Sequence, residues 1–223
     1  MFWPRSAVDL IEEQARLAAA APMPWTPGEE DVVGGCFVCF PRGPSGPGGA
    51  GDAAWAAAAA GDETVVVEDA AGAPYEPGLL ALREGALLER AVRTLPVRPD
   101  VLLVDATGRD HPRRAGLALH LGAVLDLPTV GVTHRTLLAA GVEPAHERGA
   151  QSPLCLDGEV VGAWLRTRCG CRPLAVHAAW RTDPEAAVEV VLAATRGVRT
   201  PLPLRRAREA ARVARAGRSR LTV

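Results

Sequence analysis

The sequence contains no lysine, so all 25 of its basic residues are arginine. No lysine amine can therefore serve as a catalytic or binding group. An excess of one charge sign is also absent, because 26 acidic residues leave a formal net charge of −1. A nearly neutral chain gives no global attraction for nucleic acid, so any basic surface must be local.

Long apolar runs are absent as well. No stretch of 18 or more apolar residues occurs, and no basic segment followed by an apolar stretch marks a signal peptide at the start. We therefore expect a cytoplasmic protein. Five cysteines are an odd number, which fits reduced thiols in that compartment.

The cysteine spacing disfavours a metal–thiolate site. Cys36 and Cys39 are three apart in a predicted strand, so they should face opposite sides of the sheet, and Cys169 and Cys171 are separated by one residue. A nucleophilic or redox thiol stays open if the second pair approaches the first strand.

What is present suits one compact α/β domain, since 48% of the 223 residues are hydrophobic. Residues 1–30 form an N-terminal helix and a Pro-rich connector, and residues 31–223 form the domain. Apolar periodicity and Gly/Pro positions predict helices at 7–21, 79–95, 113–124, 184–194 and 203–216. They predict strands at 32–40, 53–60, 64–69, 101–105, 128–132, 160–166 and 174–180, and a Gly/Pro loop at 44–51. The first three strands should be antiparallel, and the strand–helix–strand order after them predicts a parallel part of a mixed sheet.

One carboxylate interrupts the apolar face of the helix at 79–95. Glu84 lies four residues after Leu80, three before Leu87 and four before Leu88, whereas Arg83 falls on the opposite, charged side. A buried carboxylate is costly without a partner. Glu84 is therefore either in an arginine salt bridge or at a partly solvated edge, or it is a metal-binding or catalytic group.

A second carboxylate ends the buried strand at 101–105. Asp105 follows the continuous apolar run of residues 101–104. Open α/β sheets bind ligands at the carboxyl ends of such strands. The alternative is an aspartate that only forms the turn.

Three segments resemble the endonuclease V family, which nicks nucleic acid near deaminated adenine (inosine). They read PYEPGLLALREG at 74–85, VDATGRDHPRRAGLALHLG at 104–122 and PTVGVTHRTL at 128–137. The similarity extends from about residue 31 to the C-terminus. It implies an RNase H-like α/β fold and metal-dependent phosphodiester hydrolysis.

The resemblance also implies a site. In the family, carboxylates from a first strand, a helix and a later strand hold Mg²⁺ or Mn²⁺, and here Glu84 and Asp105 would be the second and third of them. The first-strand aspartate is replaced by Phe37, or by Cys36 after a one-residue slip. His134 stands at the position of the family's lysine.

The family's late histidine aligns with Trp180, close to His177. Asp31 and Asp52 are the acids nearest to the altered strand. Because three positions of the pattern are replaced, we expect impaired hydrolysis.

The recognition side of the resemblance is better preserved. Tyr75, between Pro74 and Pro77, matches the family's wedge, which fills the space left when a base leaves the stack. The implied hypoxanthine pocket comprises Gly78, Leu80, Gly108, His111, Leu117 and Leu137. The expected partner is inosine-containing DNA or RNA. Two basic segments could contact phosphates, namely the helix start at 111–114 and the arginine run at 205–220.

Three functions stay open at this point. The first is an inosine-directed, metal-dependent endonuclease with impaired activity. The second is a nucleic-acid-binding module without catalysis. The third is an enzyme that uses the same pocket on a small molecule, with Cys36, His134 or His177 as new chemical groups.

Overall fold

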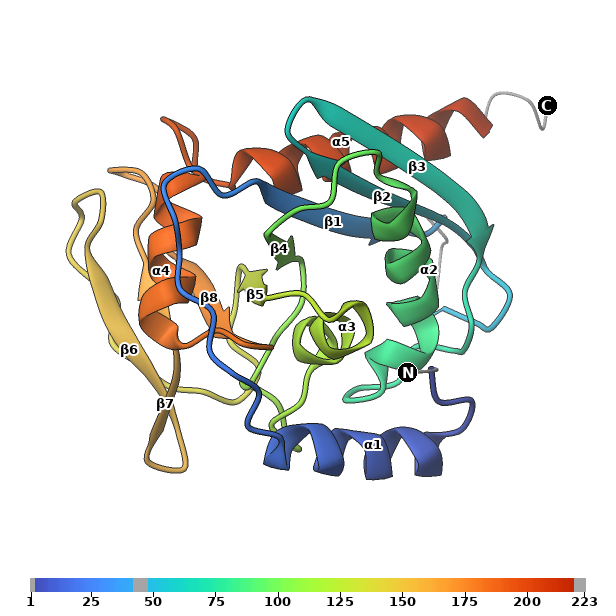
Figure 1. The fold of residues 1–223 in the computed structure, drawn as a ribbon, viewed down its shortest axis with the longest axis horizontal. Helices are drawn as coiled ribbons and strands as arrows, with labels where there is room; N and C mark the ends of the chain where they lie inside the picture. The colour runs from blue at the N-terminus through green and yellow to red at the C-terminus, as the bar shows by residue number, and fades with distance from the viewer. Residues whose placement is uncertain (1–2, 42–47, 219–223) are drawn as a thin grey trace.

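A mixed eight-stranded sheet forms the centre of the molecule (Figure 1). The computed structural model describes residues 3–41 and 48–218. The strands lie in the order β3-β2-β1-β4-β5-β8-β7-β6. Their bounds are β1 Val33–Cys39, β2 Ala53–Ala60, β3 Glu63–Ala70, β4 Val101–Val104, β5 Thr129–Thr133, β6 Gln151–Leu156, β7 Glu159–Leu165 and β8 Leu174–Ala178.

The parallel part of the sheet consists of β1, β4 and β5, and every other neighbouring pair is antiparallel. The predicted antiparallel start and parallel middle are thus confirmed. The carboxyl ends of β1, β4 and β5 consequently meet at one edge of the sheet, where the fold can gather side chains from three segments.

Helices cover both faces of the sheet. They are α1 Ala7–Ala19, α2 Leu80–Thr94, α3 Leu117–Leu125, α4 Pro184–Ala193 and α5 Leu202–Arg218. The helices α2 and α3 share one hydrophobic core with one side of the strands, and α1 packs outside them (Figure 1). The helices α4 and α5 pack on the other side.

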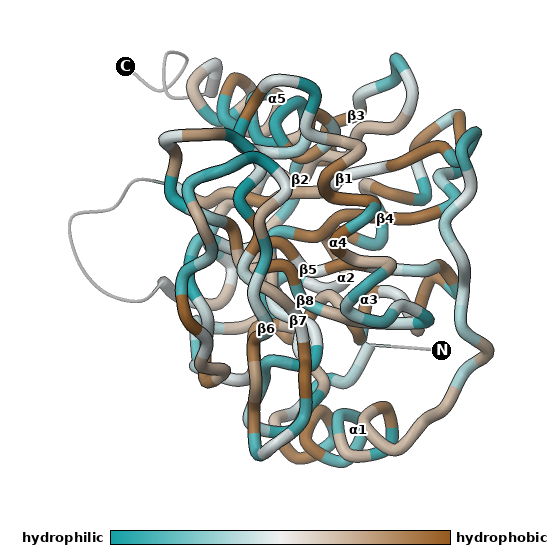
Figure 2. The backbone as a smooth tube through the Cα atoms, turned by 90° about the vertical axis from the view of Figure 1, so that its left-hand side faces the viewer, coloured by the Kyte–Doolittle hydropathy of each residue, from teal (hydrophilic) through white to brown (hydrophobic). Residues whose placement is uncertain are grey.

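The alanine-rich strand β2 contributes side chains to the hydrophobic cores on both faces of the sheet. Ala56 and Ala58 join the core beneath α2, whereas Ala57 and Ala59 pack against α5. This alternation follows from the two-residue period of a strand. Hydrophobic segments concentrate along the central strands in Figure 2, whereas hydrophilic segments mark the outer turns.

Two element predictions are wrong. The sequence pattern does not predict the edge strand β6, because Pro153 and the mostly exposed residues around it are not typical of a strand. The helix predicted from residue 113 begins only at Leu117, because Arg114 has a φ of 54° that a right-handed helix does not accommodate.

The remaining elements agree with the sequence to within a few residues. Half of the predicted Gly/Pro loop at 44–51, namely residues 44–47, lies outside the described residues. Within the described part of the chain, none of the helices is both long and apolar enough to cross a bilayer.

Arg83 is buried, in contrast to the prediction that it faces solvent. Only 4% of its surface is exposed. Its Nη1 donates to the carbonyls of Gly49 and Ala73, its Nη2 lies 2.9 Å from Asp52 Oδ2, and its guanidinium stacks 4.0 Å from the centre of the Phe40 ring. Arg83 therefore ties α2 to the segments that precede β2 and α2.

Candidate functional site

Asp105 lies at the carboxyl edge of the parallel strands, directly after β4. Its side chain is 25% exposed and accepts a hydrogen bond of 3.0 Å from Nη2 of Arg208 on α5. Such a charge-assisted contact places a positive guanidinium directly against the carboxylate. The first feature of this edge is thus an Asp–Arg ion pair.

Phe37 lies against the same arginine. The Arg208 guanidinium is 5.3 Å from the centre of the Phe37 ring, and the Arg212 guanidinium is 5.6 Å from it. An aromatic face attracts cations over this range. Phe37, which the resemblance aligns with the family's first-strand aspartate unless the alignment slips to Cys36, therefore has two arginines against its ring.

Glu84 is partly buried on α2 and is an electrostatic neighbour of Asp105. Burial raises its pKa to about 8, the Arg83 charge opposes this rise, and the negative charge of Asp105 adds to it. The two carboxylates interact, and Glu84 is mostly protonated at neutral pH.

Cys36 belongs to the same neighbourhood. It is fully buried in β1 beside Val104, and its pKa is raised well above the ordinary thiol value, first by burial and then by the charges of Asp105 and Glu84. A buried thiol held protonated is a poor nucleophile. Cys39 packs on the opposite face of the sheet, as its spacing predicts.

His134 follows β5 at this edge and is exposed. Partial desolvation of the ring lowers its pKa, and the positive charges of Arg199 and Arg208 lower it further, while Asp105 opposes them. The side chain thus shares an electrostatic environment with the Asp105–Arg208 pair.

Trp180 lies at the other end of β5. Its backbone N–H donates to Thr129 Oγ1, and Thr129 is the first residue of that strand. Because β8 runs antiparallel to β5, it carries Trp180, the residue aligned with the family's late histidine, away from Asp105.

Gly78 and His111 meet beside α1. The Gly78 carbonyl accepts hydrogen bonds from Nη2 of Arg113 at 2.7 Å and from Nε2 of Gln14 at 3.2 Å. Burial lowers the pKa of His111 to about 4, the Arg113 charge adds to this, and a hydrogen bond with the Gly78 backbone opposes it. His111 is therefore a neutral imidazole, and the N-terminal helix is fastened to this region through Gln14.

Asp110 fastens the loop that follows β5. Its buried carboxylate accepts the backbone N–H groups of Leu137, Leu138 and Ala139 at 2.7–2.8 Å. His177 Nδ1 lies 3.7 Å from Asp110 Oδ2, and its Nε2 is 2.8 Å from Thr133 Oγ1. The clamp fixes a loop on which Leu137 and Leu138 are both exposed.

The other residues of the expected base pocket differ in exposure. Tyr75 is 46% exposed on the loop before α2, and Leu80 is partly buried. Gly108 and Leu117 are buried, the latter in the core shared by α2 and α3.

Comparison with known proteins identifies the family. The endonuclease V family model matches residues 29–209. The chain belongs to the endonuclease V family. The family membership predicted from the three sequence segments is thereby confirmed.

Individual relatives agree with the family match. The protein named Endonuclease V from Geotalea uraniireducens is 46% identical over 134 residues, which are 60% of this chain and 57% of that relative. The matched segment thus spans less than two thirds of the relative's length. The endonuclease V structure from Streptomyces avermitilis is 30% identical with a TM-score of 0.81, and the match covers 97% of this chain and 96% of that one.

A more distant structure shares the fold. Endonuclease V from Ciona intestinalis, solved in complex with a 24mer DNA containing an inosine followed by a ribo-adenosine, is 17% identical with a TM-score of 0.76 over 94% of this chain and 98% of that one. These neighbours are RNase H-like, which confirms the predicted fold class.

The endonuclease V chemistry depends on a divalent metal, but the donors at this edge do not fit one. Among residues 3–41 and 48–217, no group of three or more His, Cys, Asp or Glu side chains could hold a metal ion. Asp105 is already paired with Arg208, and burial raises the pKa of Glu84 to about 8, which favours its protonated form at neutral pH. Hard cations need ionised oxygen ligands.

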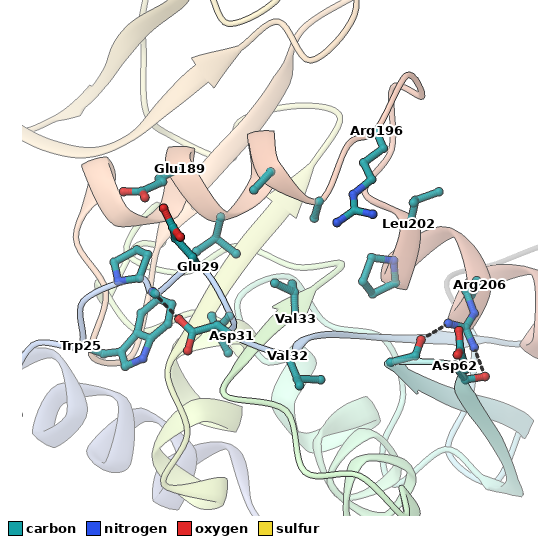
Figure 3. Close-up of a pocket in the computed structure, with 18 residues that line it drawn as sticks. Trp25, Glu29, Asp31, Val32, Val33, Asp62, Glu189, Arg196, Leu202 and Arg206 are labelled. Atoms are coloured by element: carbon teal, nitrogen blue, oxygen red, sulfur yellow. Dashed lines mark hydrogen bonds between the residues drawn. The ribbon is translucent and has the colours of Figure 1, made fainter.

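Neither of the two nearest acids supplies a substitute. Asp52 is paired with Arg83, and this contact, with burial opposing it, lowers the Asp52 pKa. Asp31 accepts the backbone N–H of Gly28 and lines a cavity of about 730 Å³ between α4, α5 and the beginnings of β1 and β4 (Figure 3). That cavity lies at the end of the strands opposite Asp105.

Arg208 is the residue that sequence reasoning missed. In the sequence it is only one member of an arginine run, whose members are expected to be solvated or to contact phosphates. The available signal was the spacing of Arg205, Arg208 and Arg212, which places three guanidinium groups along one side of α5.

Proposed function

We propose that this endonuclease V family member binds inosine-containing DNA or RNA and does not hydrolyse it efficiently. The observation that carries the proposal is the ion pair between Arg208 and Asp105. A guanidinium bound to the carboxylate competes directly with a metal ion for the same oxygen. Hydrolysis that depends on a metal at Asp105 is therefore disfavoured.

The recognition part rests on the wedge. Tyr75 is exposed on a Pro-bracketed loop, where its ring can stack on a neighbouring base. Extruding a base from the stack costs a few kcal/mol, and a stacked ring offsets part of that cost. The ring needs no metal for this role.

The pocket residues support recognition of a flat base. His111 is neutral and buried, with its ring held by the backbone of Gly78 and Arg113, so it brings no net charge to this region. The Asp110 clamp holds the backbone at Leu137 in a fixed conformation. An uncharged ring and an apolar side chain on a fixed backbone suit hypoxanthine better than a charged ligand.

The test compares two labelled strands that differ only by inosine or adenine at one position. Fluorescence anisotropy in EDTA should show tighter binding of the inosine strand. Tyr75→Ala should weaken binding of that strand by roughly tenfold, because a base–aromatic stack contributes about 1–3 kcal/mol. Tyr75→Phe is the matched control and should retain the preference. Equal affinity of the wild-type protein for both strands would refute the proposal.

A further inference from the structure

A cleft of about 610 Å³ runs along α5 beside the Asp105–Arg208 pair. Half of its lining residues are arginines, which come from three segments of the chain. They are Arg168 after β7, Arg199 before α5, and Arg205, Arg208 and Arg212 on α5. The cleft is distinct from the cavity shown in Figure 3, which lies between α4, α5 and the strand beginnings.

The positive charge in this cleft is poorly compensated. Glu209 is the one acid among its lining residues, and among the described residues Asp105 forms an ion pair with Arg208 and with no other arginine of the cleft. Within the described part of the chain, the side chains of Arg168 and Arg205 make no hydrogen bond or ion pair, and Arg212 contacts the Phe37 ring. Like charges held this close repel one another unless an anion joins them.

Arg199 is affected both by burial and by neighbouring positive charges. Its Nε and Nη2 donate to the carbonyls of Arg172 and Pro173, so it is held in the wall of the cleft. Burial lowers its pKa; Cys171 opposes this change, and the charges of Arg172 and Arg208 add to it.

Arg208 links the cleft to the carboxyl edge of the sheet. Its one hydrogen bond among the described residues goes from Nη2 to Asp105. A guanidinium carries five N–H donors, so others are available to a second acceptor. Planar guanidinium groups match the geometry of phosphate oxygens.

We propose that this arginine cleft binds phosphodiester groups of the nucleic-acid strand and holds them by guanidinium groups without a metal ion. The proposal rests on the proposed function and adds the residues that contact the backbone. Arg208 binds a phosphate nearest Asp105, and Arg168, Arg205 and Arg212 extend the contact along the strand. Binding is consequently insensitive to EDTA and strongly dependent on salt.

The test uses the full chain and two triple variants with the same change in charge. The cleft variant carries Arg168→Gln, Arg205→Gln and Arg212→Gln. The control variant carries glutamine at three exposed arginines outside the cleft, Arg5→Gln, Arg98→Gln and Arg148→Gln. Thermal melting first establishes that both variants fold. The affinity for a single strand with one inosine is then measured in EDTA at several salt concentrations.

The slope of log K against log salt should become less negative by about 2 in the cleft variant, because each lost phosphate contact on a single strand contributes about 0.7. Its affinity at low salt should fall at least roughly tenfold. The control variant should keep the wild-type slope. A cleft variant with an unchanged slope would overturn the proposal, as would wild-type binding that requires Mg²⁺.

The two proposals fail in different ways. If the wild type ignores inosine but the cleft variant still loses the salt slope, the proposed function fails and the cleft assignment stands. If the wild type prefers the inosine strand but the cleft variant keeps the wild-type salt slope, the proposed function stands and the cleft assignment fails. Inorganic pyrophosphate serves as a probe for the other source of phosphate. One outcome would overturn the nucleic-acid assignment: pyrophosphate binds the wild type more tightly than the strand does and binds the cleft variant only weakly. The cleft would then be assigned to a small phosphorylated ligand.

Discussion

Replacing Glu84 by glutamine should stabilise the folded protein in a manner that depends on pH. Below its ordinary pKa of 4.5, Glu84 is protonated in both the folded and the unfolded chain and has no effect on the difference between them. Between 4.5 and about 8 the unfolded chain releases the proton and the folded protein keeps it. The free energy of unfolding of the wild type therefore falls by about 1.4 kcal/mol for each pH unit in that window.

Glutamine does not titrate, so Glu84→Gln removes this loss. At pH 7 the variant should be more stable by about 3 kcal/mol, which corresponds to a rise in Tm of about 6–12 °C for a chain of this size. Near pH 4 the two proteins should melt together. The difference should stop growing above pH 8, where the folded protein also releases the proton.

The assay is thermal unfolding followed by circular dichroism across this pH range. Glu12→Gln is the matched control, because it removes one exposed carboxylate from another helix, α1. It should not reproduce the trend. A difference between Glu84→Gln and wild type that does not change with pH would refute this reasoning, since it would mean that Glu84 is ionised in the folded protein.

Other contacts of the site can be tested by substitution as well. Arg83→Met should lower the free energy of unfolding in urea by about 2–3 kcal/mol, because it removes a buried guanidinium that binds two backbone carbonyls and a carboxylate. An unchanged midpoint would contradict the importance of these contacts. Asp110→Asn should speed hydrogen exchange at the amides of the 137–139 loop and cost about 2 kcal/mol, whereas wild-type exchange there would show that the clamp does not hold the loop. Phe37→Asp combined with Arg208→Ala should create a metal site. With a Kd of about 1 mM, about 10 mM Mg²⁺ should raise the Tm of this double variant by about 3–6 °C. The wild type should show no such rise, and a rise in both proteins would mean that Arg208 does not exclude the metal.

The fold could be predicted because the local hydrophobic patterns and the resemblance to the family indicate the same helices and strands. The apolar run at 101–104 and the amphipathic helix around Glu84 placed β4 and α2 correctly, and the alternation in β2 follows from its position between two cores. The edge strand β6 could not be predicted in this way. An exposed strand containing proline depends on its neighbour β7 rather than on its own pattern.

The site was predictable only in part. The meeting of Glu84 and Asp105 follows from their elements, and the electrostatic coupling between them agrees with that expectation. The arrival of Arg208 at Asp105 depends on how α5 crosses the strands more than 100 residues later in the chain. The burial of Arg83 likewise depends on the distant backbone carbonyl of Gly49. Tertiary contacts of this kind have no local signal.

We infer that an arginine takes the place of the metal in this protein while inosine recognition persists. The most direct test incubates the wild-type protein with a labelled inosine-containing strand in Mg²⁺, Mn²⁺ or EDTA and measures binding and cleavage in the same samples. We expect equal binding in all three conditions and no cleavage product. Cleavage that requires the metal and disappears in Glu84→Ala would contradict the inference, because it would mean that Glu84 and Asp105 hold a working metal ion despite Arg208.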